Sequence, residues 1–91
     1  MLELQFLNQA EKFLKKLKKS DIKSAKQIII KIVELQSNPK PTDSKDLVNY
    51  YPFRRIRIAK YRVVYRYDEK TVYVTIVEKR DTIYKQLNKL L

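Results

Sequence analysis

The 91-residue sequence contains no glycine, no histidine and no cysteine. Without histidine, the chain lacks the usual general acid or base near neutral pH and the commonest protein ligand for metals. Without glycine, it cannot form a P-loop or a dinucleotide-binding fingerprint. Without cysteine, it has no disulfide, thiolate nucleophile or cysteine metal site, which is typical of a reducing compartment. Any catalysis must therefore use Lys, Arg, Tyr and the carboxylates.

Long apolar runs are also missing. No stretch reaches the length of a membrane span, and the N-terminus has no basic segment followed by an apolar stretch of signal-peptide length. Hydrophobic residues make up 44% of the chain, enough for one small core, so we expect a single domain over residues 1–91. These features predict a soluble, cytoplasmic protein with no membrane contact.

The charge is strongly positive and unevenly distributed. The chain carries 21 Lys and Arg against 10 Asp and Glu, a net charge of +11, which favours polyanionic partners. Every Arg lies between positions 54 and 80, whereas every basic residue before position 45 is Lys. Because the planar guanidinium suits bidentate contacts with phosphate and stacking on bases, the arginines are the better candidates for a functional site.

The first half of the chain predicts a strand and two helices. Residues 2–7 alternate as a strand does, and Asn8 with Glu11 has the spacing of a capping box. Apolar residues then recur at helical spacing up to Leu17, and again from Ile22 to about position 37. The lysines on the first helix are better explained by a solvated face than by contact with a nucleic-acid backbone.

The second half predicts three strands and a helix. Residues 37–52 contain all three prolines and read as a loop anchored by Leu47 and Val48. Residues 53–59, 61–67 and 71–78 are strand candidates, and an apolar stripe after position 82 predicts a helix with Ile83, Leu87, Leu90 and Leu91 on one side. The fold class is α+β in the order β-α-α-β-β-β-α: a mostly antiparallel four-stranded sheet, with a helix hairpin on one face and a short C-terminal helix.

The arginines of the predicted second strand share a side. Arg55 and Arg57 are two residues apart, and antiparallel pairing can bring Arg62 beside them. No carboxylate occurs between positions 53 and 67, which favours an anion-binding face over a merely solvated one. Arg54 points to the other side of the strand, and Arg66 either extends the charged face or pairs with a nearby carboxylate.

Three segments carry a resemblance to a known family. FRRIRI, KYRVVYRYD and EKRDTIY, in this order, are similar to the RelE branch of the RelE/ParE superfamily, the toxins of type II toxin-antitoxin modules. The resemblance covers nearly the whole chain. YRVVYRYD is common across the superfamily, and the basic residue followed by Tyr in RDTIY leans toward RelE.

The resemblance implies a metal-independent and cofactor-free endoribonuclease that cleaves mRNA in the ribosomal A site. A 2′-hydroxyl attacks the neighbouring phosphate in such enzymes, so the site must supply a proton acceptor, cations and a proton donor. By position, the resemblance implies that Arg57 and Arg62 stabilise the phosphate, Arg80 acts as general acid or clamp, and Tyr84 stacks on a base. Arg55, Lys60 and Lys79 are the further candidates for phosphate contact.

The sequence differs from the family at the residues that could accept the proton of the 2′-hydroxyl. The family often has Lys at the two basic positions of the second strand, where this chain has Arg55 and Arg57. Arginine stays protonated and stabilises charge more readily than it accepts a proton. Tyr84, Lys60, Lys79 or ribosomal RNA would then accept the proton, unless the protein relies on positioning or is a weaker nuclease.

The sequence is also compatible with two other functions, and it predicts the partners of the protein. The ParE side of the superfamily implies a non-enzymatic inhibitor of DNA gyrase, and a catalytically weak RNA-binding module is the third reading. The charge and the resemblance together predict an acidic cognate antitoxin, whose helix lies across the sheet or displaces the C-terminal helix. Operator DNA would be contacted only through the antitoxin.

Overall fold

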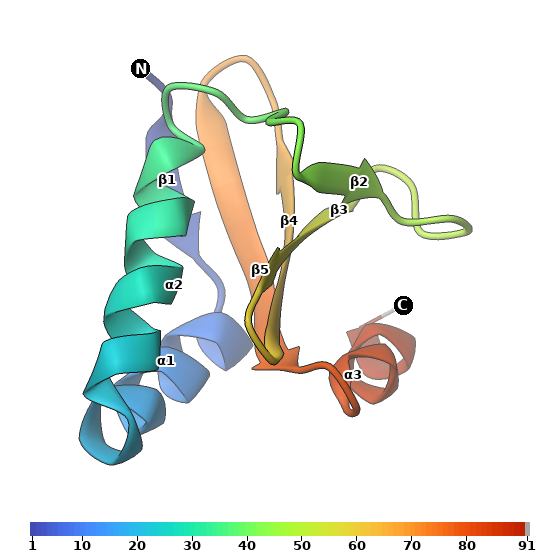
Figure 1. Ribbon diagram of the computed structural model, residues 1–91. Coiled ribbons are helices and arrows are strands. Elements are labelled where there is room, and N and C mark those ends of the chain that lie inside the picture. The colour runs from blue at the N-terminus through green and yellow to red at the C-terminus, as the bar shows by residue number, and fades with distance from the viewer. Residues whose placement is uncertain (91) are drawn as a thin grey trace.

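The computed structural model describes residues 1–90, which form a five-stranded sheet with helices on both sides (Figure 1). The sheet order is β1-β5-β4-β3-β2, with β1 parallel to β5 and all other neighbours antiparallel. The α+β class, the helix hairpin and the short C-terminal helix are confirmed. In chain order the elements are β1 (Glu3–Phe6), α1 (Asn8–Ser20), α2 (Ile22–Glu34), β2 (Ser44–Asp46), β3 (Arg54–Ile58), β4 (Tyr61–Tyr67), β5 (Thr71–Lys79) and α3 (Ile83–Leu90).

Two hydrophobic clusters occupy opposite sides of the sheet. The larger one joins the α1–α2 hairpin to alternate residues of β3, β4 and β5, such as Ile56, Val63 and Val74. The smaller one joins Ile83 and Leu87 of α3 to Val64, Ile76 and Leu47. Because β4 places Val63 on one side and Val64 on the other, a single strand contributes to both clusters. The side chains of the predicted stripe residues Leu90 and Leu91 lie outside the described part of the chain.

The fifth strand, β2, was missed by the sequence prediction. Ser44–Asp46 pairs with Arg54–Ile56 at the edge of the sheet, within the segment that we expected to be a loop. The three residues carry no apolar alternation, so period-two reasoning cannot detect them. Of the two expected anchors of this segment, Leu47 is buried as predicted, whereas Val48 is exposed and that part of the prediction is wrong.

The caps of the two N-terminal helices differ from each other. The predicted cap at Asn8 is wrong: α1 is preceded by Leu7, which makes no side-chain cap bond, because the chain runs directly from the strand into the helix. Helix α2 is capped by Asp21, whose carboxylate accepts hydrogen bonds from the Ser24 amide (3.1 Å) and hydroxyl (2.7 Å). None of the helices in residues 1–90 combines the length and apolarity that crossing a bilayer requires.

A two-residue turn joins β3 to β4. Ile58 pairs with Tyr61, which leaves Ala59 and Lys60 as the connection. Ala59 has a φ of 53°, in the left-handed region where glycine is the usual residue. The tight link predicted between these strands is confirmed, and it sets the register of the arginines that follow.

Candidate nucleic-acid interface

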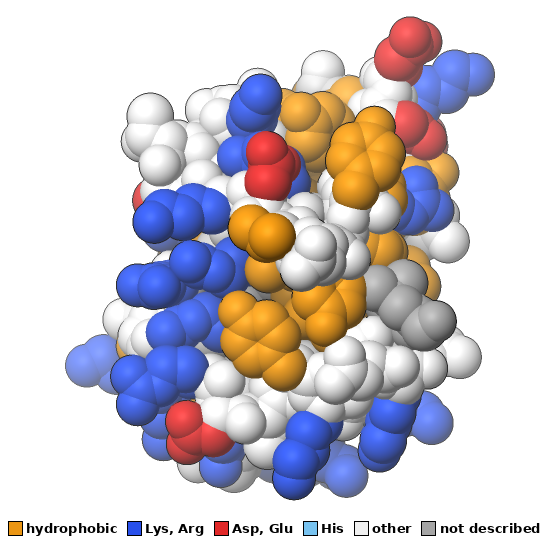
Figure 2. Space-filling model, turned by 90° about the vertical axis from the view of Figure 1, so that its right-hand side faces the viewer, with side chains coloured by type: hydrophobic (Ala, Val, Ile, Leu, Met, Phe, Trp, Pro, Cys, Tyr) orange, Lys and Arg blue, Asp and Glu red, His pale blue; other side chains and the backbone are white. Residues whose placement is uncertain are grey.

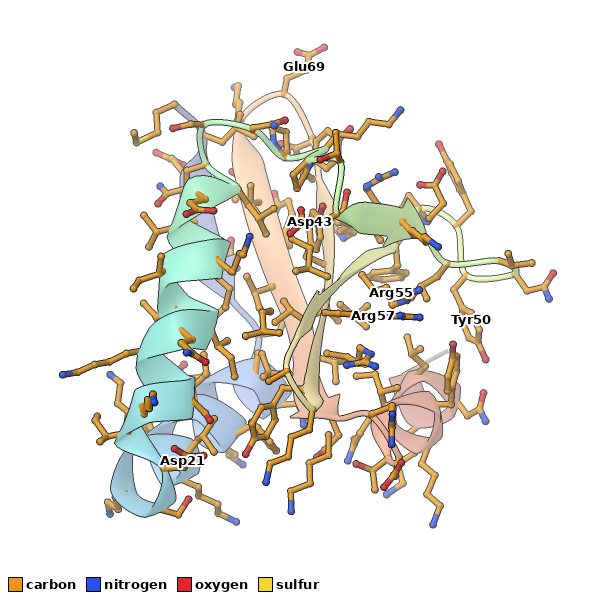
Figure 3. All side chains as sticks on the ribbon, in the orientation of Figure 1. Asp21, Asp43, Tyr50, Arg55, Arg57 and Glu69 are labelled. Carbon is orange, nitrogen blue, oxygen red and sulfur yellow. The ribbon has the colours of Figure 1, made fainter. Side chains whose placement is uncertain are left out.

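Three arginines share the side of the sheet that faces α3. Strands β3 and β4 pair so that Arg57 is directly opposite Arg62, and Arg55 is opposite Val64, which belongs to the α3 cluster. Side chains that face each other in an antiparallel pair lie on the same side of the sheet. Figure 3 shows Arg55 and Arg57 extending from β3 toward the side of α3. We call Arg55, Arg57 and Arg62 the arginine face.

Arg62 is the most buried member of the arginine face, with 9% of its surface exposed. Its guanidinium Nη1 donates hydrogen bonds to the carbonyls of Ala59 (3.1 Å) and Tyr61 (2.9 Å). Burial lowers the pKa of Arg62, and the positive charges of Arg57, Arg55 and Arg80 lower it further. Within residues 1–90, no carboxylate forms an ion pair with any arginine of this face. A bound anion would therefore relieve an unfavourable concentration of charge.

Arg80 and Tyr84 lie close to this face from the C-terminal part of the chain. Arg80 directly follows β5, and its backbone amide donates to the Lys60 carbonyl at 2.9 Å, which fixes the start of the loop leading to α3. Tyr84, in the first turn of α3, is exposed. The positive charge of Arg80 lowers the pKa of Arg62, and α3, which carries Tyr84, packs through Ile83 and Leu87 against Val64 on the side of the arginine face. The structure thus brings together the residues predicted from separate segments.

Lys60 and Lys79 lie elsewhere. Lys79 is opposite Tyr61, whose ring belongs to the hairpin cluster, so Lys79 shares the hairpin side of the sheet. Both lysines line a hollow of about 410 Å³ with residues of α1, and the Lys60 Nζ is 5.6 Å from the centroid of the Tyr61 ring. The sheet separates this hollow from the arginine face. Phosphate contact by these two lysines stays a prediction, and the arrangement gives it no support.

The two arginines of uncertain role have different environments. Arg54 is 7% exposed, on the hairpin side, where it forms an ion pair with Asp46 and donates to the Ser44 hydroxyl at 2.8 Å. It therefore holds the edge strand β2 in place. Arg66 lies with its guanidinium carbon 4.0 Å from the centroid of the Tyr73 ring, a cation–π contact, and forms no ion pair with a described carboxylate.

Sequence reasoning missed Lys45. This exposed residue of β2 is directly opposite Arg55 and shares its side of the sheet, so it extends the positive charge toward the edge. Its position becomes apparent only once β2 is known to pair with β3. Figure 2 shows the Lys and Arg side chains gathered next to a group of hydrophobic side chains on this side of the molecule. Positive charge beside apolar rings is the arrangement that binds single-stranded nucleic acid.

Comparison with known proteins identifies the family. The sequence profile described as "ParE toxin of type II toxin-antitoxin system, parDE" matches residues 4–84. The chain belongs to the RelE/ParE toxin superfamily. It is thus a toxin of a type II toxin-antitoxin system, as the resemblance of its sequence indicated. Among curated proteins, none matches the chain.

Solved toxin structures share this fold. The YoeB dimer of Staphylococcus aureus superposes with a TM-score of 0.76 at 20% identity, covering 87% of this chain and 97% of that one. RelE in the RelB-RelE complex of Methanococcus jannaschii gives 0.71 at 25% identity, covering 90% and 96%. A chain of the chromosomal ParDE system of Pseudomonas aeruginosa gives 0.73 at 12% identity, covering 87% and 96%. The fold is therefore common to YoeB, RelE and ParE proteins and does not choose among their targets.

Proposed function

We propose that this toxin is a ribosome-dependent mRNA endoribonuclease that acts in the cytoplasm and inhibits translation. The observation that carries the proposal is that Arg55, Arg57 and Arg62 share one side of the sheet, with Arg80 at the end of β5 and the exposed ring of Tyr84 on α3, which packs on the same side. This is a site for a phosphate next to a nucleobase. It fits an RNA strand, whose phosphate meets the guanidinium groups while a base stacks on the aromatic ring.

The arrangement supplies the positive charge that transesterification of RNA needs. Attack of a 2′-hydroxyl on the adjacent phosphate places additional negative charge on the phosphate oxygens, and Arg57 and Arg62 stabilise that charge. Burial and the neighbouring arginines lower the pKa of Arg62, so contact with a phosphate compensates a charge that the free protein leaves without a carboxylate partner. Arg80 stabilises the negative charge on the departing 5′-oxygen, which takes its proton from water, and Tyr84 orients a base.

The proton acceptor is the part of the reaction that the arginine face does not supply. Arginine stays protonated in proteins, so neither Arg55 nor Arg57 acts as the base. Lys60 and Lys79 lie on the other side of the sheet. We assign proton acceptance to Tyr84 or to a group of the ribosome. A proton acceptor on the ribosome would give a physical reason for cleavage only on the ribosome.

We further propose that an acidic antitoxin neutralises the toxin. The S. aureus YoeB-YefM and M. jannaschii RelB-RelE structures are complexes of a toxin with its antitoxin. The net charge of +11 and the unpaired arginine face favour a partner rich in Asp and Glu. Binding should therefore weaken steeply as the salt concentration rises.

One alternative function is inhibition of DNA gyrase, the activity that the ParE side of the superfamily implies. The matching family profile carries the name of the ParE toxin, which favours this alternative. Two assays distinguish the possibilities. Toeprinting on translating ribosomes should show truncated mRNA with the wild type and with the control variant Lys26→Ala, which changes an exposed lysine of α2. It should show intact mRNA with Arg80→Ala. If the wild type leaves mRNA intact and blocks supercoiling by gyrase, the proposal is wrong.

A further inference from the structure

Tyr50 lies in a tightly folded loop between β2 and β3, next to the arginine face. The Leu47 amide donates to the Phe53 carbonyl (3.0 Å), and further hydrogen bonds join Tyr50 to Leu47 (3.1 Å) and Phe53 to Tyr50 (2.9 Å). Leu47 and Phe53 pack in the α3 cluster, so the loop is fixed at both ends. The loop therefore presents its side chains from a defined backbone.

The hydroxyl of Tyr50 connects this loop to α3. It donates a hydrogen bond to Oδ1 of Asn88 at 2.9 Å. Asn88 and Tyr84 are four residues apart on α3 and so lie on the same side of the helix. Ile83 and Leu87 of α3 pack against Val64, which is opposite Arg55 in the sheet, so α3 borders the arginine face. In Figure 3 the Tyr50 side chain extends from the loop toward α3, beyond the ends of Arg55 and Arg57.

A purely structural role explains only part of this arrangement. Tyr50 packs against the α3 cluster but remains partly exposed, and Asn88 is itself exposed. The Tyr50 ring is therefore not enclosed by the core, and part of its surface is open to a ligand. The hydrogen bond holds the ring at the side of α3 that also carries Tyr84. Two tyrosine rings next to unpaired arginines provide stacking surfaces for adjacent bases together with contacts to their phosphates.

We infer that Tyr50 is a second base-binding residue, which stacks on a nucleotide of single-stranded RNA adjacent to the one contacted by Tyr84. The inference rests on the proposed function, because it names RNA as the ligand of the arginine face. In this arrangement Asn88 is a positioning residue: it contacts Tyr50 and no RNA.

Short single-stranded RNA containing 2-aminopurine provides a test that does not depend on catalysis. Stacking on an aromatic ring changes the fluorescence of this base analogue, so each variant yields both an affinity and a stacking signal. Tyr50→Leu, which keeps apolar packing without an aromatic face, should weaken binding about tenfold and reduce the signal. Tyr50→Phe, which keeps the aromatic face and loses the hydrogen bond to Asn88, should show an intermediate signal. Asn88→Ala should show an intermediate signal, because the ring is no longer held.

Tyr51 supplies a matched control in the same loop. Its side chain is 94% exposed and makes no side-chain hydrogen bond to the described residues. Tyr51→Ala should bind RNA as the wild type does. The inference is overturned if folded Tyr50→Leu binds and stacks like the wild type, or if Tyr51→Ala loses as much. Far-ultraviolet circular dichroism establishes that each variant is folded.

The ribosome assay separates this inference from the proposed function. If the wild type cleaves ribosome-bound mRNA and Tyr50→Leu cleaves it with unchanged KM and position preference, Tyr50 is not a base-binding residue. If the wild type leaves mRNA intact, the proposed function fails. The binding measurement then decides on Tyr50 alone, and equal affinities of wild type and Tyr50→Leu would refute the inference.

Discussion

Arg57 and Arg62 are directly opposite each other across the β3–β4 pair, with no described carboxylate in an ion pair with either. Like charges at such a position destabilise a sheet, and here Arg57 contributes to the lowered pKa of Arg62. Such a loss of folding stability is typical of binding sites, because residues placed to contact a ligand are often unfavourable in the free protein.

Arg57→Gln should therefore separate stability from function. Removing one of the two facing charges should raise the free energy of unfolding by about 0.5 kcal/mol in low salt, and mRNA cleavage should be lost. Urea denaturation at low and high ionic strength measures the first effect, which should shrink as salt screens the repulsion. Lys26→Gln, on the exposed face of α2, is the control and should change neither quantity. A less stable Arg57→Gln would contradict the charge argument.

Gln9 extends the edge of the sheet with its side chain. Its carboxamide donates to the Val77 carbonyl at 3.1 Å and accepts from the Val77 amide at 3.0 Å, beyond the point where β1 ends. Gln9→Ala leaves both backbone groups without these partners and should lower the free energy of unfolding by about 2 kcal/mol. Gln27→Ala, at an exposed position of α2, should cost far less. Equal effects in urea denaturation would show that the carboxamide is not a structural element.

At Ala59 we expect a substitution to stabilise the protein. Its φ of 53° lies in the left-handed region, which costs a residue with a Cβ about 1 kcal/mol relative to glycine. Ala59→Gly should raise the free energy of unfolding by an amount of that order, reduced by the greater freedom of glycine in the unfolded chain. Thermal and urea denaturation would measure it, and a clear loss of stability would show that the turn is not strained.

The arginine face could be predicted because it depends on one simple rule, the period of two along a strand. That rule placed Arg55 and Arg57 together, and the short turn at Ala59 and Lys60 brought Arg62 opposite Arg57. Lys60 and Lys79 show the limit of the same reasoning. They are close in sequence to the site, but the pairing of Lys79 with Tyr61 places Lys79 on the hairpin side.

The missed features depend on side-chain contacts between residues that are not neighbours in the sequence. Strand β2 is held by Arg54, which reaches Asp46 and Ser44. The Gln9 carboxamide binds a residue 68 positions away, and the bond from Tyr50 to Asn88 spans 38 positions. None of these pairs leaves a periodic pattern in the sequence, because each partner is an isolated polar residue in a short segment.

The carboxylates of Asp21 and Asp68 should contribute to the loss of folding stability at low pH. Hydrogen bonds from Ser24 lower the pKa of Asp21, and backbone amides of Lys70 and Thr71 lower that of Asp68. A lowered pKa in the folded state means that the stabilisation is present above the unfolded value of about 3.9 and is lost as pH falls below it. The double variant Asp21→Asn, Asp68→Asn should flatten the decline in melting temperature below about pH 4. An unchanged decline would contradict these assignments.

Cleavage of a ribosome-bound mRNA with a single 2′-deoxynucleotide at the A-site position tests the central claim most directly. The proposed reaction uses the 2′-hydroxyl of that nucleotide as nucleophile, so the wild-type toxin should cleave the unmodified mRNA and leave the 2′-deoxy mRNA intact at that position. Cleavage of both would contradict the mechanism at the arginine face. Failure to cleave the unmodified mRNA would contradict the assignment of this toxin as a ribonuclease.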